Sequence, residues 1–252
     1  MPLVEWDCEG SIGIATMNDP KRRNALSSDL RNGMRRCFDD FETREDLRVM
    51  IITGTGAAFC AGGDLADMPS NVKQAKVFLK DVLMWLSTPE RLAKPVIAAV
   101  NGLALGGGLE LAIACDMIVA SEEAQFGVPE ALVGLAPGFA IVRLHDRIGP
   151  ALAKEMAFTG RRLSAHEALS YGLVNSVVAA DNLLDAARTL ATSVLAAAPL
   201  SVELVKSAMN RELGGADIAY AIDAMAHLFA AKDLVEGLDA FRTKRKPHFT
   251  GS

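Results

Sequence analysis

Residues 94–110 read Lys94-Pro-Val-Ile-Ala-Ala-Val-Asn-Gly-Leu-Ala-Leu-Gly-Gly-Gly-Leu-Glu110. The β-branched apolar run Val96 to Val100 predicts a buried strand, and the triple glycine predicts the start of a helix that carries Glu110 in its first turn. Three glycines leave no side chain between the backbone and a ligand, so N–H groups at the helix start can approach a negatively charged atom. The stretch therefore predicts a site that binds an oxyanion.

Two further segments supply groups of the same kind. Upstream, the apolar run Val49 to Thr53 is followed by Gly54-Thr-Gly-Ala-Ala-Phe-Cys-Ala-Gly-Gly-Asp64. Downstream, Ala124-Gln-Phe-Gly-Val-Pro-Glu130 supplies a second glutamate just before the loop Gly134-Leu-Ala-Pro-Gly138. Two turns that expose backbone amides and two glutamates are the groups needed to polarise a carbonyl and to move protons beside it.

Four separated segments together resemble the enoyl-CoA hydratase/isomerase (crotonase) family over nearly the whole chain. They are Ala58 to Asp64, Lys94 to Asp116, Ala124 to Glu130 and the terminal Phe241-Arg-Thr-Lys-Arg-Lys-Pro-His-Phe249, in the family's order and spacing. The resemblance implies an α/β fold in which residues 1–195 form a crotonase spiral of repeated ββα units. Residues 196–252 would form a C-terminal helical region for trimerisation and coenzyme A contact. The implied reaction is hydration of an α,β-unsaturated acyl-CoA thioester to the 3-hydroxyacyl-CoA.

The resemblance assigns the chemistry to four residues. The backbone amides of Gly63 and Gly107 would bind the thioester oxygen, Glu110 would activate water, and Glu130 would protonate the α-carbon. Two carboxyls in a dry pocket push their pKa values apart, so that one can act as a base and the other as an acid. Each residue also has a structural interpretation, such as close strand–helix packing for Gly107 or dipole complementarity for Glu110. The presence of all four favours catalysis.

The same resemblance predicts where the substrate binds, with coenzyme A as part of the substrate and with no prosthetic group or metal. The predicted coenzyme A contacts are Ala58, Phe59 and Ala61, together with Phe241 and Lys244 from an adjacent subunit. The candidates for the acyl pocket are Met68, Trp85, Pro137 and Gly138. By composition alone, Lys244 is equally part of a solvated tail, and Met68 and Trp85 are equally core residues.

The loop after Glu130 departs from the family pattern. Phe139-Ala-Ile-Val142 stands where many simple enoyl-CoA hydratases have a further glycine-rich stretch, and the loop is one residue shorter. This departure resembles hydratases of branched or glutaconyl-type acyl groups, for which Arg143 is the nearest candidate cation. Isomerisation, decarboxylation and thioester hydrolysis are alternatives within the family, although isomerases often keep only one of the two acids. A noncatalytic relative that acts in assembly is a further alternative.

Composition disfavours several other classes of protein. The chain has 252 residues, of which 50% are hydrophobic and 23% are charged, so it can bury a large core. Its net charge of −5 argues against a nucleic-acid binder. The sequence contains neither G-x-x-x-x-G-K-[ST] nor G-x-S-x-G, which argues against a nucleotide-binding P-loop and a serine hydrolase. The cysteines, at Cys8, Cys37, Cys60 and Cys115, have no metal-site or disulfide spacing.

The sequence also bears on location and assembly. No apolar stretch approaches the ~20 residues of a membrane helix, and the N-terminus has no basic region followed by an apolar core. We expect a cytoplasmic protein without membrane or nucleic-acid partners. Wide apolar faces on the C-terminal helical stretches, Leu183 to Ala198 and Ala216 to Ala231, indicate packing against a partner. With the family resemblance, these faces predict a homotrimer or a homohexamer built as a dimer of trimers.

Periodicity places further elements along the chain. It predicts strands from Leu3 to Asp7, Ile12 to Met17, Met117 to Ala120 and Gln125 to Val128, and helices from Ser27 to Phe41 and Val72 to Leu86. Beyond Leu132 the chain reads as almost entirely helical, with breaks at Gly149-Pro150, Gly160, Gly172, Pro199 and Gly214-Gly215. Strand–helix alternation alone would equally fit a doubly wound sheet.

Overall fold

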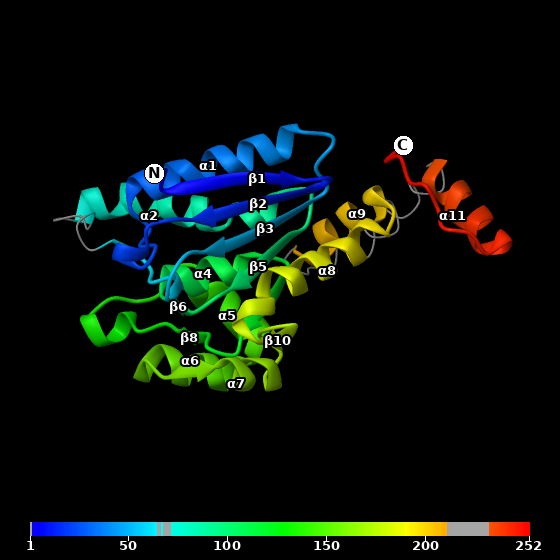
Figure 1. The fold of residues 1–252 in the computed structure, drawn as a ribbon. Coiled ribbons are helices and arrows are strands. Elements are labelled where there is room, and N and C mark those ends of the chain that lie inside the picture. The colour runs from blue at the N-terminus through cyan, green and yellow to red at the C-terminus, as the bar shows by residue number, and fades with distance from the viewer. Residues whose placement is uncertain (1, 65–66, 68–71, 211–231) are drawn as a thin grey trace.

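The chain forms two β-sheets with helices around them (Figure 1), and the strands from β3 to β8 join the two sheets in alternation. The computed structural model describes residues 2–64, 67, 72–210 and 232–252. The first sheet has six strands in the order β1-β2-β3-β5-β7-β10, and the second has four in the order β4-β6-β8-β9. The edge strands β1 and β9 pair antiparallel with their neighbours, and the other pairs are parallel.

The first part of the chain forms the predicted hairpin and helix. Strands β1 (Val4–Glu9) and β2 (Ile12–Met17) meet at a turn in which Gly10 has a φ of +58°. After the short helix η1 (Pro20–Arg22), helix α1 (Ser28–Thr43) begins at Ser27, whose hydroxyl oxygen accepts a hydrogen bond from the Leu30 amide. This N-cap satisfies one of the unpaired amides of the first turn, as the sequence predicts.

Three pairs of strands then follow one another along the chain. The pairs are β3 (Val49–Gly54) with β4 (Ala58–Cys60), β5 (Val96–Val100) with β6 (Leu103–Leu105), and β7 (Met117–Ser121) with β8 (Gln125–Gly127). In each pair, the first strand joins the first sheet and the second strand joins the second sheet. Helices α2 (Val72–Leu86), α3 (Thr88–Arg91) and α4 (Gly107–Ala114) connect the pairs. The repeated ββα spiral is confirmed, and the doubly wound alternative is excluded.

The second half of the chain differs from its predicted, almost entirely helical character. Its elements are η3 (Glu130–Val133), α5 (Ala140–Ile148), α6 (Pro150–Thr159), β9 (Arg162–Ser164), α7 (Ala165–Ser170), β10 (Ser176–Val178), η4 (Ala180–Asn182), α8 (Leu183–Leu195), α9 (Pro199–Met209) and α11 (Lys232–Thr243). The strands β9 and β10 are missing from the prediction. Each has three residues, too few for alternation to show.

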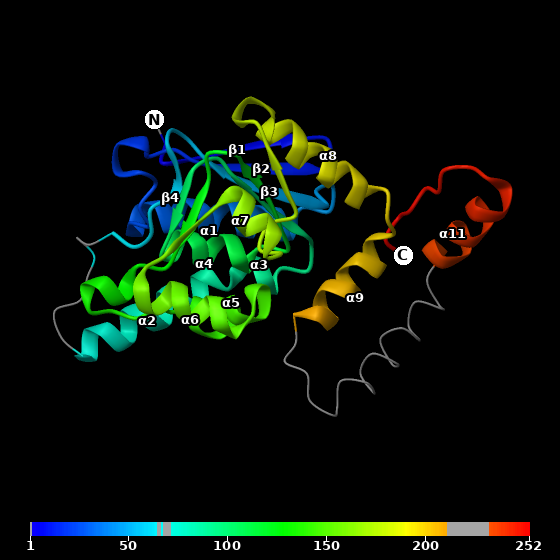
Figure 2. The ribbon, with the colours of Figure 1, turned by 90° about the horizontal axis from the view of Figure 1, so that it is seen from below.

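The first sheet is buried on both faces. In β3, Met50 and Ile52 belong to the core cluster that contains Phe38 of α1, whereas Val49 and Ile51 belong to a second cluster with α8. Figure 2 shows α8 and α1 on different sides of these strands. Parallel strands covered on both faces are typically continuous apolar runs, which explains why β3 reads Val-Met-Ile-Ile.

The C-terminal helices lie to one side of the sheets. Helix α9 leads away from α8, and α11 lies beyond it, as Figures 1 and 2 show. The predicted helical stretch Ala216 to Ala231 lies outside the described residues. The division of the chain at residue 195 stays a prediction. No single helix in the described ranges is long and apolar enough to cross a membrane, although the bent pair Ala180–Leu195 and Pro199–Met209 meets the length and composition criteria together.

Candidate active site

The ends of three neighbouring strands bring the predicted catalytic residues together. Strands β4, β6 and β8 are adjacent and parallel in the second sheet, so their carboxyl ends lie at the same edge. Gly63 follows β4, Gly107 follows β6, and Glu130 follows β8. Glu110 lies one turn into α4, the helix that starts at Gly107. Neighbouring strands are about 4.8 Å apart, which explains how residues distant in sequence share one site.

The amides of Gly63 and Gly107 lie close to each other. A β-carbon added to Gly107 would lie 3.6 Å from the Gly63 nitrogen and 3.7 Å from the Gly62 Cα. Gly63 is exposed and Gly107 is half-buried, so a ligand can reach both. Within the described part of the chain, neither amide donates to a protein acceptor. Two free amides next to each other, one of them at a helix N-terminus, form a suitable site for an oxyanion.

Glycine is required where α4 begins because other groups approach the backbone there. A β-carbon on Gly108 would lie 2.0 Å from the Cys60 carbonyl oxygen, so no other residue allows α4 to pack against β4 at this distance. Gly106 has a φ of +54°, and a β-carbon there would lie 2.6 Å from Glu130 Oε1. The triple glycine thus serves both the packing of the helix and the approach of a carboxylate.

Glu110 is a buried carboxyl held by the start of another helix. Its side chain is in the core, with 4% of the residue exposed, and its Oε1 accepts a hydrogen bond of 2.9 Å from the Ala140 amide at the N-terminus of α5. Burial raises the pKa of Glu110 to about 7, and the nearby Glu130 adds to the rise, while the amides of Ala140, Phe139 and Gly138 oppose it. A carboxyl with this pKa exchanges protons readily near neutral pH.

Glu130 differs from Glu110 in having an oxygen without a partner. Its Oε2 is buried and makes no hydrogen bond with any described residue. Burial raises the pKa of Glu130, which favours the protonated form relative to an exposed glutamate. A buried polar atom left without a partner is rare in a native fold, and a catalytic role is one explanation for it.

The predicted acyl-pocket residues divide between the site and the core. Gly138 adjoins Glu110, and a β-carbon on Gly138 would lie 3.8 Å from Glu110 Oε1. Pro137 is buried beside it in the sequence. Trp85 is 2% exposed and packs against Phe38, with 6.3 Å between the ring centres, so its ring belongs to the core. Met68 lies outside the described residues.

Leu83 contacts the same turn and is absent from the sequence prediction. A β-carbon on Gly138 would lie 2.6 Å from Leu83 Cδ2, so this side chain of α2 covers the turn that faces Glu110. The helical spacing of apolar residues in α2 is the signal that indicates it, because Leu83 lies on the side that packs toward the core.

The predicted coenzyme A contacts lie in two regions. Ala58 and Phe59 are completely buried in the core, so their side chains do not face a ligand and only their backbone remains available for contact. Ala61 is partly exposed next to the glycine turn. Lys244 is exposed just after α11, and α11 lies away from β4 of the same chain (Figure 2). The side chain of Phe241 lies outside the described residues.

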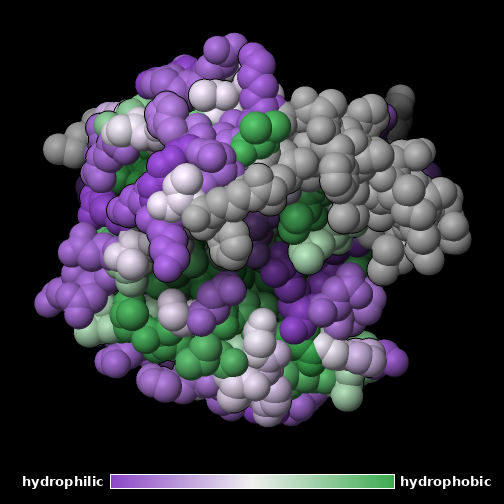
Figure 3. Space-filling model, turned by 90° about the vertical axis from the view of Figure 1, so that its right-hand side faces the viewer, coloured by the Kyte–Doolittle hydropathy of each residue, from purple (hydrophilic) through white to green (hydrophobic). Residues whose placement is uncertain are grey.

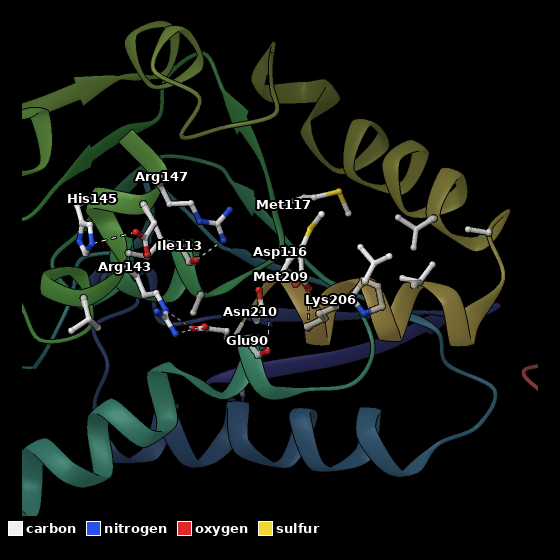
Figure 4. Close-up of a pocket in the computed structure, with 18 of the residues that line it drawn as sticks. Glu90, Ile113, Asp116, Met117, Arg143, His145, Arg147, Lys206, Met209 and Asn210 are labelled. Atoms are coloured by element: carbon white, nitrogen blue, oxygen red, sulfur yellow. Dashed lines mark hydrogen bonds and ion pairs between the residues drawn. The ribbon is translucent and has the colours of Figure 1, made fainter. Parts of the chain in front are cut away.

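A separate cavity of about 1010 Å³ lies on the other side of α5, against α8 and α9 (Figure 4). None of the four predicted catalytic residues lines it. Arg143, the predicted cation for a second substrate carboxylate, lines this cavity and pairs with Glu90, with 2.7 Å between Nη2 and Oε1. The structure therefore does not support that prediction, because the guanidinium is neutralised within the protein and lies away from Glu110.

Comparison with known proteins identifies the family of the chain. The family model for enoyl-CoA hydratase/isomerase matches residues 7–252. The chain is 38% identical to a short-chain-enoyl-CoA hydratase of Clostridium acetobutylicum over 244 residues, which is 94% of each chain. It is 38% identical to a crotonyl-CoA hydratase of Syntrophomonas wolfei over 247 residues, 96% of this chain and 95% of the relative.

A solved structure extends the comparison to the fold. The crystal structure of an enoyl-CoA hydratase from Bacillus anthracis superposes with a TM-score of 0.94 at 35% identity, covering 99% of this chain and 100% of that one. Sequence and fold therefore agree over nearly the full length. The chain belongs to the enoyl-CoA hydratase/isomerase family of enzymes.

Proposed function

We propose that this protein hydrates an α,β-unsaturated acyl-CoA thioester to the 3-hydroxyacyl-CoA. The observation that carries the proposal is the convergence of two free amides and two carboxyls with raised pKa values at one edge of the second sheet. The names of the relatives, a short-chain-enoyl-CoA hydratase and a crotonyl-CoA hydratase, support the same reaction class. The substrate brings coenzyme A with it, water is the second reactant, and the proposed steps use only side chains and amides of this chain.

The two amides act on the thioester oxygen. As water attacks the β-carbon, negative charge moves through the conjugated system onto this oxygen, and the Gly63 and Gly107 N–H groups donate to it. They are already fixed by the strand ends and by α4, so they need no reorganisation when the charge appears. One such donor contributes roughly 2.7–4 kcal/mol to the transition state in other enzymes.

The two glutamates divide the proton transfers. Glu110 takes a proton from water as the C–O bond forms at the β-carbon, because the amides at the start of α5 favour its ionised form. Glu130 delivers a proton to the α-carbon, where the electrons of the double bond form the new C–H bond. The reaction leaves Glu110 protonated and Glu130 ionised, and proton exchange between the pair or with solvent restores the starting state.

The hydration test uses crotonyl-CoA and longer enoyl-CoA thioesters with the purified protein. Hydration removes the absorbance of the conjugated thioester and yields a 3-hydroxyacyl product that chromatography identifies. A 3-enoyl-CoA substrate separates isomerisation from hydration, since an isomerase would first create the conjugated absorbance. Methylglutaconyl-CoA tests the branched alternative. Absence of a hydroxyacyl product from every enoyl-CoA would overturn the proposal.

The proposal extends to assembly as a homotrimer or a dimer of trimers, with Phe241 and Lys244 reaching the coenzyme A of a neighbouring subunit. Support comes from the face beside α9, where Figure 3 shows a broad hydrophobic area. The apolar residues Ile141, Val142, Val205 and Met209 of α5 and α9 are between 52% and 79% exposed. Light scattering measures the assembly directly, and Lys244→Ala should raise KM for acyl-CoA without lowering kcat.

A further inference from the structure

A turn between η1 and α1 holds the glycine segment that presents Gly63. At its centre, Asn24 is completely buried and has a φ of +54°. Its side-chain Nδ2 donates to the carbonyl oxygens of Thr55 at 3.1 Å, Ala58 at 2.8 Å and Phe59 at 3.2 Å. Its Oδ1 accepts from the Asp19 amide at 2.8 Å. One side chain therefore ties the turn to both ends of the β3–β4 connection.

The backbone on either side of Asn24 continues the same attachment. The Ala61 amide donates to the Arg23 carbonyl at 3.0 Å, and the Leu26 amide donates to the Gly62 carbonyl at 2.8 Å. Leu26 also forms an isolated parallel bridge with Gly63. The residues that approach the oxyanion site are thus paired with the turn, one after another.

Leu26 extends this contact to the second amide of the site. A β-carbon on Gly107 would lie 2.9 Å from Leu26 Cδ1, so the Leu26 side chain rests against the start of α4. Leu26 therefore contacts Gly63 through its backbone and Gly107 through its side chain. A shift of the turn would change the distance between the two amides.

We infer that Asn24 is a positioning residue for the oxyanion site: its side chain fixes the turn against the exit of β4 and so sets the spacing of the Gly63 and Gly107 amides. This inference rests on the proposed hydration. A left-handed turn alone needs only glycine or asparagine. The four side-chain hydrogen bonds exceed that need. One, from the Asp19 amide, closes the turn itself, and the other three go to the segment from Thr55 to Phe59 that leads to the site.

The test compares two variants of Asn24 with a distant asparagine. Asn24→Gly tolerates the positive φ and deletes every side-chain hydrogen bond. Asn24→Asp keeps the volume and the acceptor for the Asp19 amide but places an oxygen where Nδ2 donates. The control is Asn175→Ala, because Asn175 Oδ1 accepts from the Ile118 amide at 2.8 Å in the first sheet and contacts no residue of the site.

Two readouts separate positioning from a general loss of structure. The first is kcat and KM for enoyl-CoA hydration. The second is the absorption maximum of a bound conjugated aryl-enoyl thioester, which moves to longer wavelength as hydrogen bonds polarise its carbonyl. Thermal midpoints measured in parallel show how much each substitution destabilises the fold.

Both Asn24 variants should lower kcat on the order of 10²-fold, the cost of misplacing a catalytic group by about 1 Å, with KM little changed. The absorption shift of the bound thioester should shrink in both, while Asn175→Ala keeps wild-type kcat and shift despite a lower midpoint. A folded Asn24→Gly with wild-type kcat and shift would overturn the inference. If Asn24→Gly fails to fold, Asn24→Asp decides by the same criteria.

Failure of the proposed function has a different signature. If the wild-type protein hydrates no enoyl-CoA but still shifts the absorption of the bound thioester, the proposed hydration is refuted. The role of Asn24 is then tested by the absorption shift in the Asn24 variants alone. A wild-type protein that hydrates normally, with Asn24 variants that match the control, would refute only the role of Asn24.

Discussion

Two groups of polar residues flank α5, and they differ in the partners that their charged side chains have. At the start of the helix, Glu110 is held by backbone amides alone, and Glu130 Oε2 has no partner among the described residues. On the cavity side, Arg143 pairs with Glu90, and Lys206 Nζ lies 2.8 Å from Asp116 Oδ2 (Figure 4). Among the described residues, the carboxyls of the first group form no ion pair, whereas the charged side chains of the second group are paired with each other.

Under the proposed mechanism, the difference separates groups that react from groups that hold the fold. Lys206 Nζ also donates to the carbonyl oxygens of Pro89 and Lys94, so α9 is attached to the segment before β5 through one buried ammonium. The paired charges are costly to separate but chemically inert. The carboxyls at the site are costly to bury and therefore remain ready to exchange protons.

The largest expected effect concerns the unpartnered carboxyl. Glu130→Gln should lower kcat by about 10²–10⁴-fold, the range for loss of general acid–base help, because an amide cannot deliver the proton to the α-carbon. The measurement is steady-state hydration of enoyl-CoA. The matched control is Glu90→Gln in the paired group, which should keep nearly wild-type kcat. Equal losses of kcat in Glu130→Gln and Glu90→Gln would contradict the distinction between the two groups.

The next effect is on stability and lies in the paired group. Lys206→Met leaves Asp116 largely buried without its cation and should lower the free energy of unfolding by about 3–5 kcal/mol. Denaturant titration measures this loss. The double variant Lys206→Met/Asp116→Asn should recover part of it, because the unpaired charge is then gone. A single variant as stable as the wild type would show that the ion pair does not hold α9.

Replacement of Glu110 should raise the free energy of unfolding instead of lowering it. Its pKa of about 7 lies above the ordinary glutamate value of 4.5, so the folded state binds an extra proton between these pH values. The destabilisation is therefore absent below pH 4.5, grows as the pH rises, and is complete above pH 7. Glu110→Gln should stabilise the protein by about 3 kcal/mol at pH 8, with the gain shrinking toward pH 5. Unfolding titrations at several pH values test this, and a pH-independent difference would contradict it.

The smallest effect concerns Arg143. Its pair with Glu90 is partly exposed, with 28% and 14% of the two side chains accessible, so Arg143→Met should cost only about 1 kcal/mol of stability. If methylglutaconyl-CoA is a substrate, its KM should be unchanged in this variant because Arg143 faces the cavity beside α9. A rise in KM for methylglutaconyl-CoA alone would instead indicate that Arg143 contacts the substrate.

The family resemblance predicts the spiral and assigns the four central site residues. The segments that carry the resemblance can be recognised because glycine turns after apolar strands are local signals that keep their order along the chain. Asn24 has no such signal, since one asparagine in a polar turn looks like any other. Its importance comes from segments 31 to 35 positions away that accept its hydrogen bonds.

Other wrong predictions have the same physical origin: the local sequence pattern does not show which neighbouring element a side chain contacts in the folded protein. Arg143 follows Ala140, the hydrogen-bond partner of Glu110, in α5, yet its side chain pairs with Glu90. Trp85 has the spacing of a helix face that serves either a pocket or a core, and packing against Phe38 decides for the core.

The parallel pairing of β4 with β6, and of β6 with β8, also has a consequence for how the protein matures. Ala58 pairs with Leu103, and Leu103 pairs with Gln125, so every contact in this sheet closes a long loop of chain. Such topologies have high contact order and fold slowly. During synthesis, the Gly63 and Gly107 amides can come together only after β6 and the start of α4 have emerged, and Glu130 can join them only after β8. The site is therefore incomplete until β4, β6 and β8 have all left the ribosome.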